Sequence, residues 1–347
     1  MEFGILMGDE RVEVPAAEHL DTLLRVAAAA QRNGFTYLTI GQHFLYDGYR
    51  WMQPVPLLSR LAAELDDNVR LGTSIIIGPL YHPVMLAEEL ATLDILTGGR
   101  LVVAVGTGYL PAEYERLGVP FKERYQRLEE LLTIIRLLWS QDRVSFTGRF
   151  WRLDDVPVHL KPLQQPSPPI WLGAQKELGV RRAARLTDNW TVTPQQNVAD
   201  VDALARVFAA ERMTLGLPLH PLPVRRELMI GRDRDDALRR FAAVARGKYE
   251  AYADRGMRAL SREQVRARFA STVRDHVILG DAEDCRDQVR DLASRIPMGP
   301  MLVRPHWPGM SADAAVAYLD AVGREIVAPL RDLEPVSFED FLAKKAG

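Results

Sequence analysis

Short apolar runs alternate with longer amphipathic stretches along the whole chain. The runs at residues 2–7, 37–40, 69–77 and 101–105 are aliphatic and are scarcely interrupted by polar residues. Such runs are typical of parallel strands that are buried on both faces. Further runs at 170–172, 189–192, 224–230 and 301–303 raise the number of predicted strands to eight.

Apolar residues at helical spacing predict helices between these strands. Residues 16–33 carry a stripe of leucine and alanine, and Gly34 stands where a left-handed C-terminal cap is expected. Pro83 suits the first turn of a helix, where its missing N–H costs nothing. The predicted helices are 16–33, 54–65, 83–96, 121–140, 178–186, 198–215, 233–255, 281–295 and 311–332, with a hairpin at 144–153.

Strand and helix alternate throughout, which predicts an α/β fold with a parallel sheet. About eight such units predict closure into a (β/α)8 TIM barrel with insertions. The length of 347 residues would also suit two domains, but no linker divides the pattern. The proline-rich stretch 161–169 lies inside the repeat and is interpreted as a long loop. We therefore expect one barrel domain over residues 1–347.

Composition narrows the possible partners. The net charge is −2, so no bulk positive field favours nucleic acid or an anionic membrane. Cys285 is the single cysteine, which excludes an internal disulfide framework and a cysteine-rich metal site. The N-terminal apolar run follows an acidic residue and is too short for a signal peptide. We expect a cytoplasmic protein without nucleic-acid or membrane partners.

Candidate chemistry follows the ends of the predicted strands, because TIM-barrel enzymes carry their active sites on those loops. After the second strand the chain carries His43 together with Phe44, Tyr46, Tyr49 and Trp51. Aromatic residues in such a loop favour a ligand wall, although the same rings could seal the top of the barrel. His43 is a candidate general acid or base, or a structural histidine held by hydrogen bonds.

Two glycine-containing turns offer close backbone approach to a ligand. Thr107 lies between two glycines after the fourth strand, but the third glycine of a dinucleotide fingerprint is absent. That segment is therefore either a ligand turn or a plain turn. Residues 173–176 lead into a helix and end in Lys176, which predicts a phosphate site, with a solvated lysine as the alternative.

Motifs of several other enzyme classes are absent from the sequence. None of the seven histidines shows the HxH or HExxH spacing of a zinc site. Neither a GxSxG elbow nor a phosphate-binding P-loop occurs. We therefore expect no metal, and neither an ordinary hydrolase nor a kinase.

From about Met1 to Trp190 the chain resembles the bacterial-luciferase-like flavin oxidoreductases and monooxygenases. The resemblance rests on motifs in matching order and spacing, and Leu302–Met310 is similar to a last-strand motif of one branch. The other matching segments are Val69–Pro79, His82-Pro83, Ala87-Glu88, Leu93-Asp94, Thr97–Arg100, Gly106–Gly108, Glu113–Gly118, Phe121–Arg124 and Pro168–Gly173.

This resemblance implies a barrel that binds FMN, or the deazaflavin coenzyme F(420), at its C-terminal mouth. Members that use FMN commonly work with a separate flavin reductase, which supplies reduced FMN for reaction with O2. The resemblance also implies a non-prolyl cis peptide between Ser74 and Ile75. We further expect a homo-oligomer, most simply a homodimer.

The resemblance assigns cofactor-binding residues by position. It places Thr73, Ser74 and Ile75 along the isoalloxazine ring, with Thr107 and Gly108 near it. His43 matches a histidine that faces the cofactor. The residues assigned to the phosphate are Gly173, Ala174, Gln175, Lys176 and Gly179.

The sequence departs from two branches of this family. Luciferases proper have an acidic residue and a histidine at Gly41 and Gln42, and an arginine at Thr107. Deazaflavin sugar dehydrogenases have an aspartate at Gln42 and a glutamate at Tyr109. The leading hypothesis is a two-component monooxygenase that uses reduced FMN and O2 on a small organic substrate.

The leading hypothesis also assigns residues to the substrate site, and two alternative functions remain open. Under the leading hypothesis His43 is catalytic, and the residues that contact the substrate are Phe44, Tyr46, Tyr49, Trp51 and Tyr109. One alternative is hydride transfer with the deazaflavin F(420). The other is a flavin-binding protein without catalysis.

Overall fold

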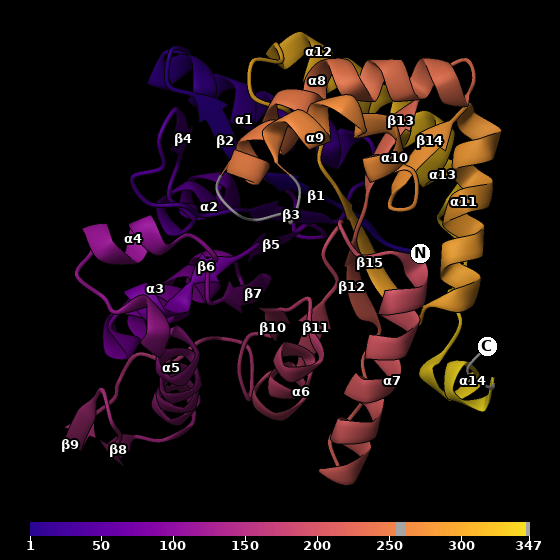
Figure 1. Ribbon diagram of the computed structural model, residues 1–347. Helices are drawn as coiled ribbons and strands as arrows, with labels where there is room; N and C mark the ends of the chain where they lie inside the picture. Colours follow the sequence, from indigo (N-terminus) through magenta and orange to yellow (C-terminus); the bar gives the residue numbers. More distant parts are fainter. Residues whose placement is uncertain (255–260, 345–347) are drawn as a thin grey trace.

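The described residues contain eight parallel strands in the barrel that the sequence predicts (Figure 1). The computed structural model describes residues 1–254 and 261–344. The strands follow the order β11–β10–β7–β5–β3–β1–β15–β12, and a parallel bridge between Val192 and Val224 joins the two ends. The barrel strands are β1 (Phe3–Met7), β3 (Tyr37–Ile40), β5 (Arg70–Thr73), β7 (Leu101–Gly106), β10 (Ile170–Gly173), β11 (Asn189–Thr191), β12 (Leu222–Arg225) and β15 (Met298–Val303).

The strands are buried on both faces, as their apolar runs predict. Every residue of β1 and of β7 is buried. Each fully buried aliphatic side chain contributes about 1.5–3 kcal/mol, so the barrel interior is a major part of the core. All carboxyl ends of these parallel strands point to one mouth, and this mouth gathers the loops that carry the candidate site.

Helices cover the barrel where the apolar stripes predict them. The first helix ends just before Gly34, whose φ of 80° is the expected left-handed cap. The helices are α1 (Ala16–Arg32), α2 (Pro54–Ala62), α3 (Pro83–Leu96), α4 (Pro111–Arg116), α5 (Arg124–Ser140), α6 (Glu177–Leu186), α7 (Val198–Thr214), α8 (Arg234–Asp254), α9 (Arg262–Ala267), α10 (Phe269–Val273), α11 (Ala282–Arg295), α12 (Ala312–Val322), α13 (Ala328–Leu330) and α14 (Phe338–Ala343). Within the described ranges, no helix combines the length and the hydropathy that a membrane span requires.

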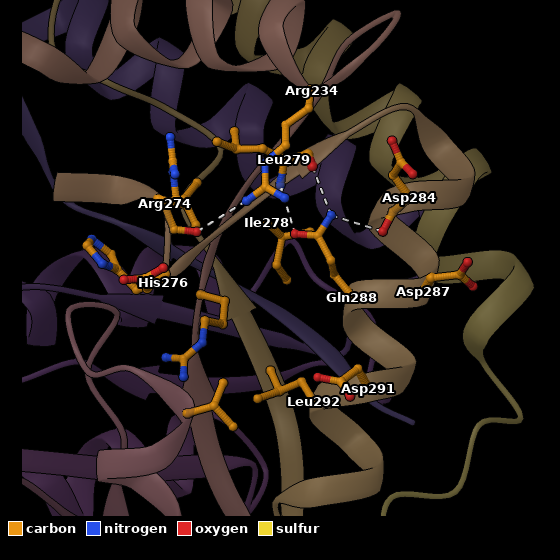
Figure 2. A pocket seen from close by; sticks show the side chains of 14 residues that line it. Arg234, Arg274, His276, Ile278, Leu279, Asp284, Asp287, Gln288, Asp291 and Leu292 are labelled. Carbon is orange, nitrogen blue, oxygen red and sulfur yellow. Dashed lines mark hydrogen bonds between the residues drawn. The ribbon is translucent and has the colours of Figure 1, made fainter. Parts of the chain in front are cut away.

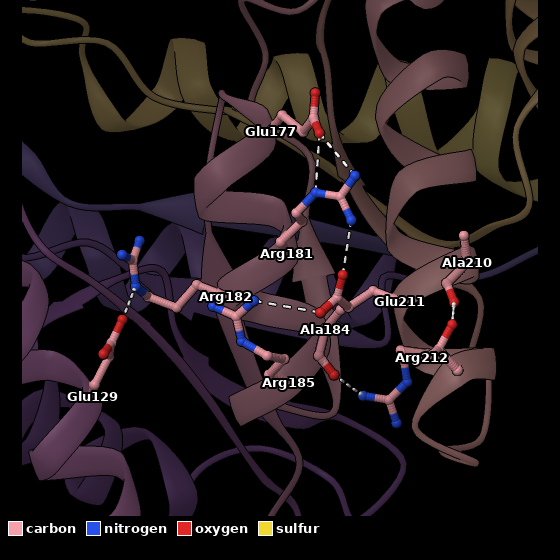
Figure 3. A network of polar contacts seen from close by, with 10 residues as sticks. Glu129, Glu177, Arg181, Arg182, Ala184, Arg185, Ala210, Glu211 and Arg212 are labelled. Carbon is pink, nitrogen blue, oxygen red and sulfur yellow. Dashed lines mark hydrogen bonds and ion pairs between the residues drawn. The ribbon is translucent and has the colours of Figure 1, made fainter.

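Ion pairs join three neighbouring helices, α5, α6 and α7 (Figure 3). Arg182 of α6 reaches Glu129 of α5 at 2.5 Å, and Arg181 of α6 reaches Glu211 of α7 at 2.8 Å. Such exposed pairs contribute little each, on the order of 0–1 kcal/mol. The buried Arg212 does more, because it donates to the carbonyl oxygen of Thr187 just beyond α6 at 2.7 Å. These contacts fix α6, whose start is the predicted phosphate site.

The prediction of one strand over 224–230 is wrong. The segment forms two strands, β12 in the barrel and β13 (Glu227–Ile230) outside it, and β13 pairs in parallel with β14 (Val277–Gly280). The chain leaves the barrel at Arg226, yet the apolar pattern continues because both strands are buried. The sequence analysis did not predict β14.

Two short antiparallel strand pairs lie outside the barrel sheet. The predicted hairpin is present as β8 (Arg143–Thr147) and β9 (Arg152–Pro157). The other pair, β2 (Asp9–Arg11) with β4 (Tyr49–Trp51), was not predicted from the sequence. Its residues are polar or aromatic and the strands have three residues each, so no alternation could reveal them. This pair carries Asp9 and Trp51 to the mouth.

The strand after α2 is interrupted at the predicted cis peptide. β5 ends at Thr73, the Ser74–Ile75 bond is cis, and β6 (Ile76–Ile77) resumes pairing with β7. The structure therefore confirms the cis bond that the family resemblance implies. A second, X-Pro cis bond at Gln165–Pro166 was not predicted.

An aromatic cluster attaches α8 to the segment after β15. Phe241 and Tyr249 of α8 contact Trp307, with ring centroids 5.5 and 6.4 Å apart. Phe269 of α10 packs on the same rings. Aromatic contacts of this kind contribute beyond their buried area. The cluster therefore fixes Lys248, the neighbour of Tyr249, beside the barrel mouth.

Candidate active site at the barrel mouth

The predicted cofactor residues and His43 follow four adjacent strands. The barrel order β10–β7–β5–β3 brings together the ends of these strands, although they are far apart in the sequence. Ser74 follows β5, Thr107 follows β7, Gly173 ends β10, and His43 lies just beyond β3. The structure thus places these residues along one side of the mouth, next to the loop that carries the aromatic residues.

The β5 end forms a close-packed cradle. The hydroxyl of Thr73 donates to the carbonyl oxygen of Ala104 at 2.7 Å and accepts from the same residue's N–H at 2.9 Å. Thr73 therefore holds β5 to β7 and has no free hydroxyl for a ligand. Ile75 lies against two glycines: a Cβ on Gly106 would meet it at 2.8 Å, and a Cβ on Gly173 at 3.5 Å. Only glycine at 106 leaves room for Ile75 there.

The β7 turn also depends on glycine. Gly108 has a φ of 63°, and a Cβ there would approach Ile77 at 3.0 Å. The preceding carbonyl oxygen, that of Thr107, accepts from the hydroxyl of Tyr114 in α4. The hydroxyl of the buried Tyr114 therefore holds this turn in place.

The start of α6 has features suited to an anion. Lys176 is the N-cap residue, it is exposed, and no side chain caps the first N–H groups of the helix. Ala174 is held by the indole N–H of Trp190, which donates to its carbonyl oxygen at 2.9 Å. Gly179 permits this turn, because a Cβ there would lie 2.9 Å from that of Ala174. Gln175, also exposed, completes the loop.

His43 is held by a buried carboxylate that the sequence did not reveal as its partner. Its Nδ1 lies 3.0 Å from Oε1 of Glu113, and the N–H of Phe44 donates to the same oxygen at 2.7 Å. Glu113 is fully buried in α4, and its Oε2 has no hydrogen-bond partner among the described residues. Because a carboxylate oxygen accepts, Nδ1 carries the hydrogen and Nε2 remains available to a ligand. The motif Glu113–Gly118 had matched the family, but nothing in its spacing linked it to His43.

Three aromatic rings surround the imidazole. Ring centroids of Tyr46 and Trp51 lie 4.6 Å from that of His43, and the ring of Tyr109 lies 5.5 Å away. Tyr49 contacts Tyr46 at 6.0 Å and extends the wall. Burial raises the pKa of Tyr109 far above its usual range, so its hydroxyl stays protonated as a donor. Four of the five residues predicted for the substrate wall therefore form one contiguous surface, namely Tyr46, Tyr49, Trp51 and Tyr109.

Phe44 departs from this group. Its nearest ring is that of Tyr81, with centroids 6.1 Å apart. Tyr81 in turn accepts a hydrogen bond from Gln42 Nε2 at 2.6 Å, and Gln42 Oε1 accepts from the N–H of Ile77 at 2.9 Å. Gln42 is thus engaged in holding the β3 loop against β6. Phe44 belongs to that packing more than to the wall around His43.

A buried charge cluster, composed of Asp9, Arg304 and Lys248, lies behind the wall. The Lys248 ammonium pairs with the Asp9 carboxylate, whose other oxygen accepts from Arg304 at 2.9 Å. Burial alone would raise the pKa of Asp9, but the two cations outweigh it and hold the pKa well below its usual range. The ammonium also lies 4.4 Å from the ring centre of Trp51 and 4.5 Å from that of Tyr49.

Sequence reasoning missed this cluster, although a signal was present. Asp9 follows β1 and Arg304 follows β15, so each is a charged residue directly beyond a buried strand end. Those strands are neighbours in the barrel, which brings the two side chains together. Nothing in the sequence indicated that Lys248 is buried, because lysines on long helices are usually solvated.

A separate hollow of about 470 Å³ lies between β14 and α11 (Figure 2). Arg234 and Arg274 lie on one side of it, and Asp284, Asp287 and Asp291 of α11 lie on the other. Because the lining carries both cationic and anionic side chains, it favours neither an anionic nor a cationic ligand. None of the sequence-predicted site residues lines it, so the mouth remains the candidate site.

A closed parallel barrel with its polar and aromatic groups at the strand ends has the architecture of a TIM-barrel enzyme. The model of the luciferase-like monooxygenase family matches residues 1–297, and the chain belongs to this family. A crystal structure of a monooxygenase from Streptomyces bottropensis superposes with a TM-score of 0.81 at 22% identity, covering 95% of this chain and 99% of that one. At that identity the likeness shows the fold alone.

Two curated relatives represent two cofactor branches. The chain is 31% identical over 198 residues to the FMNH(2)-dependent dimethylsulfone monooxygenase of Pseudomonas putida, covering 56% of this chain and 54% of that protein. It is 33% identical over 178 residues to the F(420)-dependent glucose-6-phosphate dehydrogenase of Microbacterium testaceum, covering 49% and 52%. The chain thus spans about half the length of the curated relatives it matches.

Proposed function

We propose that this protein is a monooxygenase that uses reduced FMN and O2 on a small organic substrate. The observation that carries this proposal is the imidazole of His43, oriented by Glu113 and enclosed by aromatic rings beside the β5, β7 and β10 ends. A similarity to an FMNH(2)-dependent monooxygenase supports it. A cofactor that arrives reduced requires a separate reductase as partner.

The residues at the mouth fit a flavin phosphate and ring. The exposed Lys176 and the uncapped N–H groups of α6 suit a phosphate, because helix starts favour anions. The cradle of Gly106, Gly173 and Ile75 offers a smooth apolar surface of the kind that a flat ring needs. In this proposal Ser74, Thr107 and Gly108 complete the ring site, and Gly173, Ala174, Gln175 and Gly179 complete the phosphate site.

Reduced flavin supplies the reactivity toward O2, and the protein supplies orientation, proton control and exclusion of water. Nε2 of His43 can take or give a proton because Nδ1 is engaged by Glu113. Tyr109 keeps its proton and can donate a hydrogen bond. Tyr46, Tyr49 and Trp51 form an apolar surface that limits the entry of water.

Hydride transfer with F(420) is the second candidate, favoured by the similarity to an F(420)-dependent dehydrogenase. Deazaflavin sugar dehydrogenases carry acidic residues at the positions of Gln42 and Tyr109, and both of these side chains are neutral in this protein. Gln42 is committed to Tyr81 and Ile77, and Tyr109 stays protonated. These two observations favour the monooxygenase.

Titration of the purified protein separates the candidates. We expect reduced FMN to bind, and O2 consumption to rise when a suitable substrate is present. Absorbance changes and an oxygen electrode record both on one sample. Tight binding of F(420) without O2 uptake would replace the monooxygenase by the hydride-transfer enzyme, and flavin binding without turnover of any kind would indicate a non-catalytic binding protein.

Substitution of Lys176 tests the phosphate site. Lys176→Glu should weaken binding of FMN at least tenfold and leave binding of riboflavin within a few-fold, since only FMN carries the phosphate charge. Fluorescence quenching of each flavin measures both affinities. Lys344→Glu, at an exposed lysine just beyond α14, is the matched control. Equal losses for FMN and riboflavin would place the phosphate elsewhere.

A further inference from the structure

One buried arginine in the hollow between β14 and α11 has unused hydrogen-bonding capacity. Arg226 lines this hollow and is only 3% exposed. Its Nη1 donates to the carbonyl oxygen of Arg225 at 2.9 Å, whereas its Nη2 has no partner among residues 1–254 and 261–344. A buried donor without an acceptor costs free energy, so a ligand that supplies the acceptor is stabilised there.

Arg226 is also a buried cation without a counterion. Burial lowers the pKa of Arg226 to about 10, which leaves the guanidinium charged at neutral pH. Its Nη1 meets only the carbonyl oxygens of Arg225 and Thr193, and no carboxylate in the described part of the chain pairs with the guanidinium. Neutral carbonyl oxygens stabilise a buried charge less than a carboxylate does. An anionic group at this position would therefore be stabilised.

The other charges of the hollow limit which anion can enter. The exposed Arg234 and Arg274 add two cations to that of Arg226. Because carboxylates outnumber guanidinium groups in the lining, a doubly charged anion such as phosphate meets repulsion. A ligand that carries one charge of each sign matches the lining. The carboxylates belong to Asp275, Asp284, Asp287 and Asp291.

Asp291 is the carboxylate best placed for the cationic group of such a ligand. Figure 2 shows its side chain extending from α11 into the hollow, whereas that of Asp287 extends away. Asp287 also pairs with Arg290 at 2.6 Å. The contact of Asp291 with Arg295 is long, at 3.5 Å, so this carboxylate retains most of its capacity to accept.

The rest of the lining suits a compact aliphatic group. The hollow has a volume of about 470 Å³, within the range of small-molecule sites. No phenylalanine, tyrosine or tryptophan is among the described residues that line it, so a flat ring finds no stacking partner. The apolar lining residues are Val198, Val277, Ile278, Leu279 and Leu292.

We propose that this hollow binds an aliphatic amino acid, with its carboxylate on Arg226 and its ammonium group facing Asp291. Charge-assisted hydrogen bonds from a buried guanidinium to a carboxylate are among the stronger polar contacts in proteins. The site is separate from the barrel mouth, because β13 and β14 pair outside the barrel. The proposal therefore goes beyond the proposed function and does not depend on it.

The test compares L-leucine with two analogues that each lack one charge. L-Leucinamide lacks the carboxylate, and 4-methylpentanoate lacks the ammonium group. Calorimetry on the full-length protein at neutral pH should show leucine binding about tenfold or more tightly than either analogue. Equal binding of 4-methylpentanoate and leucine would indicate a simple anion site, and absence of leucine binding would indicate a water-filled hollow. Either result would overturn the proposal.

Two variants assign the charges to residues. Arg226→Met should abolish the preference for leucine over leucinamide, and Asp291→Asn should abolish the preference for leucine over 4-methylpentanoate. Arg149→Met, at an exposed arginine in the β8–β9 turn, should preserve both preferences. Unchanged leucine binding in Arg226→Met and Asp291→Asn would place the amino acid elsewhere and overturn the proposal.

Thermal unfolding distinguishes a binding arginine from a structural one. The melting temperature of Arg226→Met should be unchanged or higher, because a buried cation without a counterion is removed. Added leucine should raise the melting temperature of the wild-type protein but not that of this variant. If Arg226→Met does not fold, the exposed Asp291→Asn decides alone, since a wild-type preference for leucine over 4-methylpentanoate in that variant contradicts the proposed site.

Discussion

Replacement of His43 by asparagine should lower turnover by roughly 10²–10⁴, the usual contribution of a general acid or base. Asparagine can still donate a hydrogen bond to Glu113, so the loop should keep its position. It cannot take or give a proton near neutral pH, which is the property that the proposal requires of Nε2. Product formation coupled to reduced-flavin supply measures the change, and flavin binding should stay within a few-fold.

A structural role for His43 predicts a different pattern. Its ring packs on Tyr46 and Trp51, so a histidine that only filled this space would lower the melting temperature when replaced. Turnover per folded molecule would then hardly change, and such a result would remove His43 from the catalytic residues. His159→Asn, at an exposed histidine, is the control for the chemical change itself.

Periodicity was sufficient to predict the barrel but not its additions. The apolar runs of β1 and β7 predict buried parallel strands because both faces of each strand are covered. The same rule joined β12 and β13 into one strand, because a buried strand outside the barrel has the same pattern. The bridge that joins Val192 to Val224 is a long-range contact that no local pattern contains.

Sequence reasoning proposed candidate site residues where they follow a strand end and missed the contacting partners that lie on a helix. His43 and Trp51 were found because an aromatic loop after a strand is unusual. Glu113 lies on α4 and Lys248 lies on α8. The pattern of polar and apolar residues along these helices does not show which residues the two side chains contact in the folded protein. Both become visible only after folding, when a buried charge needs a partner.

The same physical requirement makes Asp9 the residue on which the mouth depends most. Asp9→Asn removes the one carboxylate shared by Lys248 and Arg304 and leaves two buried cations facing each other. Breaking a buried pair in this way costs about 3–5 kcal/mol, so the urea midpoint should fall markedly while the slope of the transition is kept. Asp155→Asn, in an exposed ion pair with Arg143, should leave the midpoint nearly unchanged.

The pH dependence of unfolding gives an independent check of this ion cluster. The lowered pKa of Asp9 means that its stabilising contribution is complete above the ordinary aspartate pKa of about 3.9. The contribution is then lost as the pH falls toward the lower pKa of the folded state, because the unfolded chain binds the proton more readily. The wild-type protein should therefore lose stability between about pH 5 and pH 2 more steeply than Asp9→Asn, which has no carboxylate to titrate there. Parallel acid profiles for the two proteins would mean that the carboxylate of Asp9 contributes nothing to the stability of the folded mouth.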